Sequence, residues 1–265
     1  MRTLRWALAG VAVVAVALYA TVLLLLFSHQ RELLFIRGRH ALARGEEYQA
    51  RAITEADGTR VTVWQTPAAR ADGPVIAFFY GNAGAVSDFA AIGAAFHRQG
   101  YGVLLASYRG YPGNSGSPSE DGIMADARAI LGALPKGHGK VILWGQSLGT
   151  GVAARMAAEG YGAALILQSP YTAVVDVAAR RFSMFPVRLL MKDRFDTAAL
   201  VSRIDVPVLI MSGTADVTVP FDMGQTLARL FGRRATFVPF PGEGHELPEW
   251  GVASVANKWL RTRPL

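Results

Sequence analysis

A glycine-flanked serine at the end of an apolar run is the feature that most restricts the fold of this chain. The motif Gly145-Gln146-Ser147-Leu148-Gly149 follows Val141–Trp144 directly and opens a helical pattern that continues to Glu159. Such a strand-turn-helix serine is typical of a strained nucleophile elbow, which exposes the side chain at the edge of a sheet. The flanking residues must be small because strand and helix approach closely. The alternative is a glycine-rich turn with a bystander serine.

Apolar runs of strand length alternate with helical patterns along most of the chain. The expected strands cover residues 75–80, 102–107, 141–144, 164–168, 208–212 and 235–240. This alternation predicts an α/β fold with a mostly parallel central sheet and helices on both faces. Two earlier segments, 48–54 and 60–65, flank Asp57-Gly58 and predict an antiparallel hairpin at one edge.

One connection is too long for a simple crossover. About forty residues separate Gln168 from Val208. The stretch from about 171 to 203 is rich in Phe, Leu and Met, and we expect a small helical cap over the carboxyl edge of the sheet. The alternative is one longer crossover helix.

The N-terminal region carries no charge from Trp6 to Phe27. As a helix this run spans about 30 Å, the thickness of a bilayer core. Ala15-Val16-Ala17 resembles a signal-peptidase site, but it lies inside the apolar run, so we expect an uncleaved single-pass transmembrane helix over residues 1–29 and a catalytic domain over 30–265. Residues 30–44 are basic and amphipathic, and predict a helix that either lies on lipid head groups or is a simple linker.

The side of the membrane is open, because the rule that relates orientation to positive charge counts Lys and Arg near both ends of the helix. Arg2 and Arg5 favour a cytoplasmic N-terminus. The arginines after the helix favour a cytoplasmic catalytic domain slightly more strongly; they are Arg31, Arg37, Arg39 and Arg44.

Composition excludes several function classes. The chain of 265 residues has no cysteine, which excludes disulfides, thiolate metal sites and a cysteine nucleophile. Its net charge of +7 comes from scattered residues, mostly arginines. This favours a solvated surface beside an anionic membrane over nucleic-acid binding, which needs a basic stripe.

Ser147 would need a histidine base and an orienting acid at the same edge of the sheet. The chain has five histidines, namely His29, His40, His97, His138 and His245. Only His245 follows the last expected strand, so it is the expected base. Asp216, after the strand at 208–212, is the expected acid, with Glu243 in reserve; Asp193, Asp196, Asp205 and Asp222 lie elsewhere. The order Ser147, Asp216, His245 is that of an α/β-hydrolase fold.

Two backbone donors are expected to bind the oxyanion of such a site. One is the N–H of Leu148, at the start of a helix where backbone donors are free. The other is the N–H of Asn82, in the loop Tyr80-Gly81-Asn82-Ala83-Gly84. A purely structural glycine turn is the alternative for this loop. The expected site uses no cofactor and no metal ion.

Several of these motifs together resemble the BEM46-like α/β-hydrolases, whose neighbourhood includes membrane-anchored ABHD13-type and ABHD17-type hydrolases. They are the Tyr80–Gly84 loop, Tyr108–Gly116, Gly145–Gly151, Ser169-Pro170-Tyr171, Asp216 and His245. The resemblance covers about residues 45 to 262. It implies the fold, the triad and a membrane-proximal acyl hydrolase. Relatives usually carry a structural histidine where this chain has Tyr80, whose phenol can also donate a hydrogen bond.

The sequence thus predicts a membrane-anchored serine hydrolase that cleaves esters or thioesters through an acyl-enzyme. Its expected partners are the membrane and a small acyl or lipid-like substrate, or a lipidated protein, but no nucleic acid. Three alternatives stay open: an aminopeptidase- or oligopeptidase-like hydrolase with the same triad, an acyltransferase, and a catalytically silent binding protein at the membrane.

Overall fold

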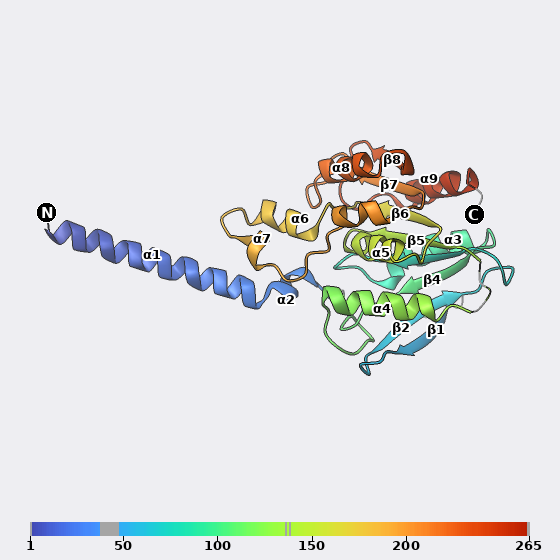
Figure 1. Cartoon of the computed structure of the whole chain (residues 1–265), viewed down its shortest axis with the longest axis horizontal. Helices are drawn as coiled ribbons and strands as arrows, with labels where there is room; N and C mark the ends of the chain where they lie inside the picture. The colour runs from blue at the N-terminus through green and yellow to red at the C-terminus, as the bar shows by residue number, and fades with distance from the viewer. Residues whose placement is uncertain (1, 38–47, 136, 138, 264–265) are drawn as a thin grey trace.

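The computed structural model describes residues 2–37, 48–135, 137 and 139–263, and Figure 1 shows its course. Its centre is an eight-stranded sheet in the order β1-β2-β4-β3-β5-β6-β7-β8. The strands are β1 (Gln49–Thr54), β2 (Arg60–Thr66), β3 (Val75–Phe79), β4 (Gly102–Ala106), β5 (Val141–Gln146), β6 (Ala164–Gln168), β7 (Val208–Gly213) and β8 (Ala235–Phe240). The pairs β1–β2 and β2–β4 are antiparallel and the remaining pairs are parallel.

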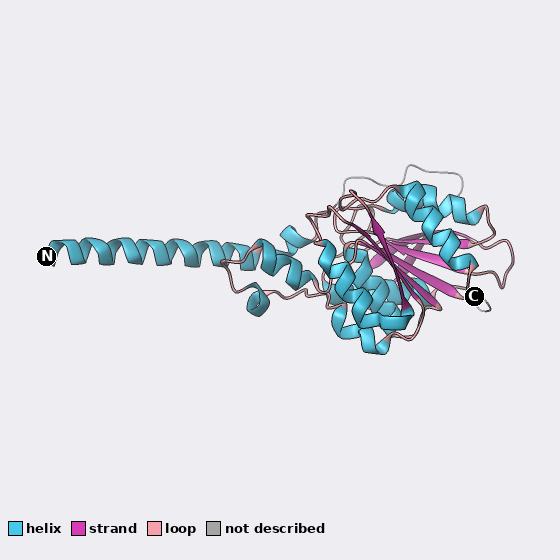
Figure 2. Ribbon diagram, turned by 90° about the horizontal axis from the view of Figure 1, so that it is seen from above, coloured by secondary structure: helices cyan, strands magenta, loops and turns pink. Residues whose placement is uncertain are grey.

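Helices cover both faces of this sheet (Figure 2). The longer ones of the sheet domain are α3 (Ala90–His97), α4 (Glu120–Gly132), α5 (Leu148–Ala158), α8 (Phe221–Phe231) and α9 (Glu249–Arg261). Helix α3 contacts α9, and α4 contacts α5. Every residue of β3, β4, β6 and β7 is buried, which is why these strands read as continuous apolar runs. The predicted α/β-hydrolase architecture is confirmed, with strand ends within two residues of the expected ones.

The cap consists of short helices between β6 and β7. They are α6 (Val174–Arg181), α7 (Val187–Leu190) and the 3-10 helix η2 (Ala198–Arg203). A bridge between Ala173 and Asp196 closes the base of this excursion. The segment is therefore a separate small layer, and the alternative of a single long crossover helix is wrong.

One predicted helix ends earlier in the structure, and another helix is preceded by a 3-10 turn. The juxtamembrane helix α2 covers Gln30–Leu34 only, and residues 35–37 are not helical; the rest of the predicted stretch, with His40, lies outside the described residues. The helix ends there because Phe35 turns into the core against Phe195, at a ring-centroid distance of 6.3 Å. After β3, a 3-10 turn, η1 (Val86–Phe89), precedes α3, and the Asp88 carboxylate accepts from Ala85 N–H at 2.8 Å within it.

Helix α1 (Arg2–Ser28) projects from the sheet domain (Figure 1). Its mean hydropathy is 2.6 over its most apolar stretch, and none of that stretch is buried against protein. By length and composition it can cross a membrane, a property that signal sequences share.

Candidate active site

The turn at Ser147 has the geometry that its flanking glycines require. Ser147 adopts φ 49° and ψ −119°, a conformation that non-glycine residues rarely hold. A Cβ on Gly145 would overlap the Gly149 backbone, and one on Gly149 would overlap the Phe79 carbonyl of β3. The strand, the helix and the neighbouring strand are therefore in backbone contact, and this contact orients Ser147 at the carboxyl edge of the sheet.

Ser147, His245 and Asp216 form one hydrogen-bonded line. The Nε2 atom of His245 lies 2.8 Å from Ser147 Oγ, and its Nδ1 lies 2.8 Å from Asp216 Oδ2. The second oxygen of Asp216 accepts backbone N–H groups of Thr218 at 2.9 Å and Val219 at 2.8 Å. The Asp216 side chain is buried and that of His245 is mostly buried. The structure thus brings the three predicted residues together in the predicted order of contacts.

The loops that carry His245 and Asp216 contact each other, and the histidine loop also contacts Ser169, the residue that follows β6. A Cβ on Gly213, before the Asp216 turn, would overlap the Gly244 carbonyl, so the two loops touch through their backbones. Ser169, with φ 52°, donates its hydroxyl to the His245 carbonyl at 2.8 Å. This support for the histidine was not predicted, although Ser169-Pro170-Tyr171 was among the motifs of the resemblance.

The other acidic and histidine candidates are engaged elsewhere. His29 contacts the Leu25 carbonyl and His97 the Tyr101 carbonyl, while His138 lies outside the described residues. Among the carboxylates, Asp193 pairs with Arg31, Asp205 with Arg234 and Asp222 with Arg180, while Asp196 accepts Ala199 N–H. Glu243 contributes its backbone carbonyl, which accepts Ala215 N–H at 2.9 Å.

The loop with the second expected oxyanion donor lies beside Ser147. A Cβ on Gly81 would stand 3.2 Å from the Ser147 Cβ. The side-chain amide of the next residue, Asn82, donates to the Leu34 carbonyl at 3.0 Å. Leu148, the other expected donor, is the first residue of α5 and directly follows Ser147. Both candidate donors therefore belong to backbone that adjoins the serine.

Three tyrosines fix the backbone of the loop Tyr80–Gly84. Tyr108 donates its hydroxyl to the Tyr80 carbonyl at 3.0 Å, and Tyr111 donates to the Asn82 carbonyl at 2.8 Å. The hydroxyl of Tyr80 itself lies 3.3 Å from Ser107 Oγ. Burial raises the pKa of all three phenols, so they stay protonated donors. The carbonyls on both sides of Gly81 are thereby fixed, a support that sequence reasoning did not find.

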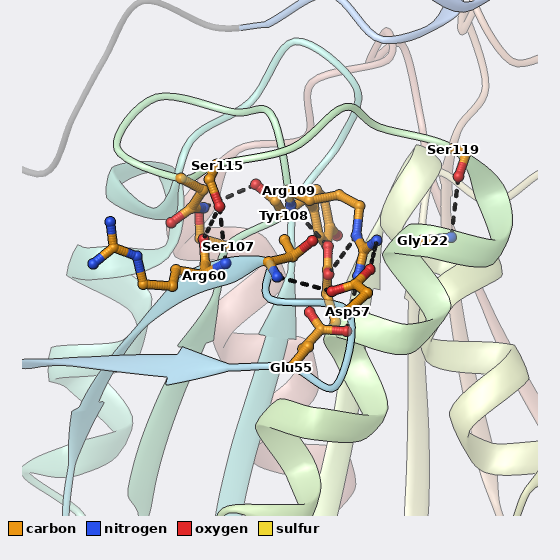
Figure 3. A network of polar contacts seen from close by, with 12 residues as sticks. Glu55, Asp57, Arg60, Ser107, Tyr108, Arg109, Ser115, Ser119 and Gly122 are labelled. Carbon is orange, nitrogen blue, oxygen red and sulfur yellow. Dashed lines mark hydrogen bonds and ion pairs between the residues drawn. The ribbon is translucent and has the colours of Figure 1, made fainter.

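The loop that carries Tyr108 and Tyr111 is secured by Arg109 (Figure 3). Its guanidinium contacts Asp126 at 2.7 Å, Glu55 at 2.8 Å and Asp57 at 2.9 Å. Three carboxyl groups thus surround one cation. Burial, with a hydrogen bond that the protonated carboxyl of Asp126 donates to Glu55, raises the pKa of Asp126 to about 8. The cluster joins the hairpin turn, α4 and the loop behind the site.

Over the described ranges, no group of three or more His, Asp or Glu side chains is placed to hold a metal ion.

Comparison with known proteins identifies the family. Residues 74–198 match the family described as alpha/beta hydrolase fold. The chain is 33% identical over 250 residues to the uncharacterized protein Rv2307c of Mycobacterium tuberculosis, covering 89% of this chain and 88% of that protein. It is 32% identical over 206 residues to the lysophosphatidylserine lipase ABHD12 of Danio rerio, covering 67% and 54%. It is 34% identical over 149 residues to human alpha/beta hydrolase domain-containing protein 17B, covering 54% and 50%.

The chain spans about half the length of the last two relatives. Among solved structures, the Pyrococcus furiosus esterase Pf2001 has a TM-score of 0.67 at 16% identity, over 86% of this chain and 97% of that one, which is a likeness of fold. The chain belongs to the α/β-hydrolase superfamily, with ABHD-type proteins among its relatives.

The raised pKa of Asp126 predicts a pH-dependent contribution to stability. Between about pH 5 and pH 8 the folded chain keeps a proton on Asp126 that the unfolded chain has released, so this contribution falls as pH rises through the folded pKa. Asp126→Asn mimics the protonated carboxyl. We expect the melting temperature of this variant, relative to wild type, to rise steadily across that range.

The matched control is Asp222→Asn, in the exposed ion pair with Arg180, because that pair lowers the pKa of Asp222. Its difference from wild type should stay constant above about pH 5. An equally constant difference for Asp126→Asn would contradict the assignment of the buried proton.

Proposed function

We propose that the protein is a membrane-anchored serine hydrolase that cleaves carboxylic esters or thioesters. The observation that carries the proposal is the line of contacts from Asp216 through His245 to Ser147, with both distances at 2.8 Å. A serine hydroxyl is a weak nucleophile until a base within hydrogen-bond reach removes its proton. Membership of the α/β-hydrolase superfamily supports the same reaction type.

In the proposed reaction, Ser147 Oγ attacks the acyl carbonyl while its proton moves to His245 Nε2. Asp216 accepts a hydrogen bond from Nδ1–H of His245, which fixes the tautomer and stabilises the imidazolium that forms. The N–H groups of Leu148 and Asn82 bind the oxyanion of the tetrahedral intermediate. His245 then gives its proton to the leaving alcohol or thiol, and the acyl group stays on Ser147.

Water completes the cycle by the same route. His245 takes a proton from a water molecule, whose oxygen attacks the acyl-enzyme carbonyl, and returns that proton to Ser147 Oγ as the acid leaves. An alcohol in place of water would give acyl transfer, because both compete for one acyl-enzyme.

The proposed substrate class follows from the N-terminal helix and the relatives. If α1 crosses a bilayer, acyl chains of lipids or lipidated proteins are present at high local concentration near the domain. The Danio rerio relative is named a lysophosphatidylserine lipase, and the structural neighbour from Pyrococcus furiosus is named an esterase. These names favour ester cleavage over peptide cleavage for this chain.

Ser147→Ala should abolish covalent labelling of the full-length protein by a fluorophosphonate probe, because the alanine offers no oxygen for the phosphonyl group. Ser202→Ala, at an exposed serine of η2, is the matched control and should label as wild type does. Undiminished labelling of Ser147→Ala, measured by in-gel fluorescence, would contradict the assignment of Ser147 as the nucleophile.

Tyr111→Phe should lower kcat for a soluble ester by about tenfold with little change in KM, because the carbonyl of Asn82 loses the donor that orients the loop. Tyr101→Phe removes a hydroxyl from a ring that packs on Phe96 and serves as control. Equal kcat values for the two variants, at equal melting temperatures, would show that Tyr111 does not position the oxyanion loop.

A chain-length series of p-nitrophenyl esters and acyl-CoA thioesters, run beside peptide substrates, tests the substrate class. We expect kcat/KM to rise with acyl length, because burial of each methylene adds about 0.8 kcal/mol of binding free energy. Turnover of peptides alone would reject the proposal in favour of a peptidase.

A further inference from the structure

The tip of the cap runs alongside the C-terminal half of α1 (Figures 1 and 2). The ring of Tyr19 stacks on Phe185 at a centroid distance of 5.3 Å, and its hydroxyl donates to the Met184 carbonyl at 2.9 Å. Further along, Lys192 Nζ lies 4.7 Å from the centre of the Phe27 ring. The cap segment from Met184 to Lys192 thus follows the helix from Tyr19 to Phe27.

This register fixes the depth of the cap tip relative to the apolar run. Tyr19 precedes Phe27, the last residue of the uncharged run, by a length of helix that corresponds to about 12 Å. The charged partners begin beyond Phe27, where Arg31 pairs with Asp193 at 2.7 Å. If Phe27 marks the membrane surface, Met184 and Phe185 lie at the depth of acyl chains.

The side chains of the tip suit that depth. Met184 and Leu189 are 80% and 81% exposed, so two large apolar side chains face the surroundings of the protein. From Phe182 to Met191 the single charged residue is Arg188, and its guanidinium pairs with the Asp176 carboxylate. Apolar side chains that project from the protein beside a membrane-spanning helix are typical of contact with lipid.

The backbone of the tip is also suited to a medium without water, where each polar group needs a partner within the protein. The hydrogen bond from the Tyr19 hydroxyl to the Met184 carbonyl gives each of these two groups its partner. Backbone N–H groups of the tip donate to carbonyls within the cap; the donors include Phe182, Phe185, Val187, Leu189, Leu190 and Met191. Pro186, between them, has no N–H to satisfy.

Basic residues lie where the tip would leave the hydrocarbon. Lys192 and Arg194 follow it and Arg180 and Arg181 precede it. Lysine and arginine at this level are attracted to anionic lipid head groups. The order along the segment is therefore basic, apolar, basic, as expected for a loop that dips into one leaflet and returns.

We propose that the cap tip, Phe182–Met191, inserts into the same bilayer leaflet as the C-terminal half of α1, and that the membrane partner of this face is lipid acyl chain. The inference rests on the proposal that α1 spans the membrane. It goes beyond anchoring, because the catalytic domain then has a second membrane contact and a fixed orientation. The side chain of Asn82, beside the Ser147 turn, donates to the Leu34 carbonyl of α2, so the segment that directly follows α1 adjoins the candidate site.

Depth-dependent fluorescence quenching tests the insertion in the full-length protein. The chain has no cysteine, so Met184→Cys and Leu189→Cys each give one site for a polarity-sensitive nitrobenzoxadiazole label. The labelled proteins are reconstituted into vesicles of phosphatidylcholine and phosphatidylglycerol that carry a nitroxide either on the acyl chain or on the head group. Leu24→Cys, on the exposed surface of α1, reports the span, and Ala71→Cys, in an exposed loop before β3, is the water-exposed control.

We expect Met184→Cys and Leu189→Cys to lose fluorescence with acyl-chain nitroxide as Leu24→Cys does, while Ala71→Cys keeps its signal. Quenching of Leu24→Cys without quenching of the two cap sites would overturn the insertion and leave the anchor intact; so would a blue-shifted but unquenched cap label, which indicates cover by a second copy. An unquenched Leu24→Cys would reject the anchor and the insertion together. Fluorophosphonate labelling in the same vesicles reports the hydrolase proposal separately.

Discussion

The backbone contact between the Ser147 turn and the end of β3 is the constraint on which the rest of the site depends. Gly145, Gly149 and the Phe79 carbonyl meet at a separation that leaves no room for a Cβ atom. This contact brings three separate segments to one edge of the sheet and holds Ser147 in a left-handed conformation. A serine in a looser turn would have several rotational positions, whereas here the turn presents it to His245 in one.

The loops around that contact are held by a succession of polar contacts. The ion cluster of Arg109 secures a loop, the loop supplies two phenols, and the phenols fix the carbonyls beside Gly81. On the other flank, Ser169 and the Gly213–Gly244 contact restrain the histidine loop. Ion pairs thus secure the loop behind the oxyanion segment, while neutral hydrogen bonds of tyrosine and serine hydroxyls hold the two loops that contact the Ser147 turn.

The sequence was sufficient to predict the sheet and the grouping of Ser147, Asp216 and His245, for a physical reason. Strands buried on both faces are continuous apolar runs, and residues that directly follow parallel strands must meet at one edge. Contacts between loops could not be predicted in this way. Tyr111 reaches Asn82 only because of the path of a glycine-rich loop, and α2 ends early because Phe35 finds a place in the core.

The same limit applied to the pairing of α1 with the cap, which joins segments more than 160 residues apart. Tyr19 inside an apolar helix gave a local signal, since a phenol in such a run needs a partner, but the sequence did not say which carbonyl would supply it.

The contact of Asn82 with Leu34 has a consequence for how the chain can be divided. The segment after the apolar helix contributes a buried phenylalanine and a hydrogen-bond acceptor to the sheet domain, so it is a piece of that domain in covalent continuity with the helix. A cut before Gln30 would leave both contacts in the sheet domain. A cut after Phe35 would remove them and leave the Asn82 side chain, in the loop beside the serine, without its acceptor. The border between the apolar helix and the sheet domain therefore lies at the first turn after the apolar run.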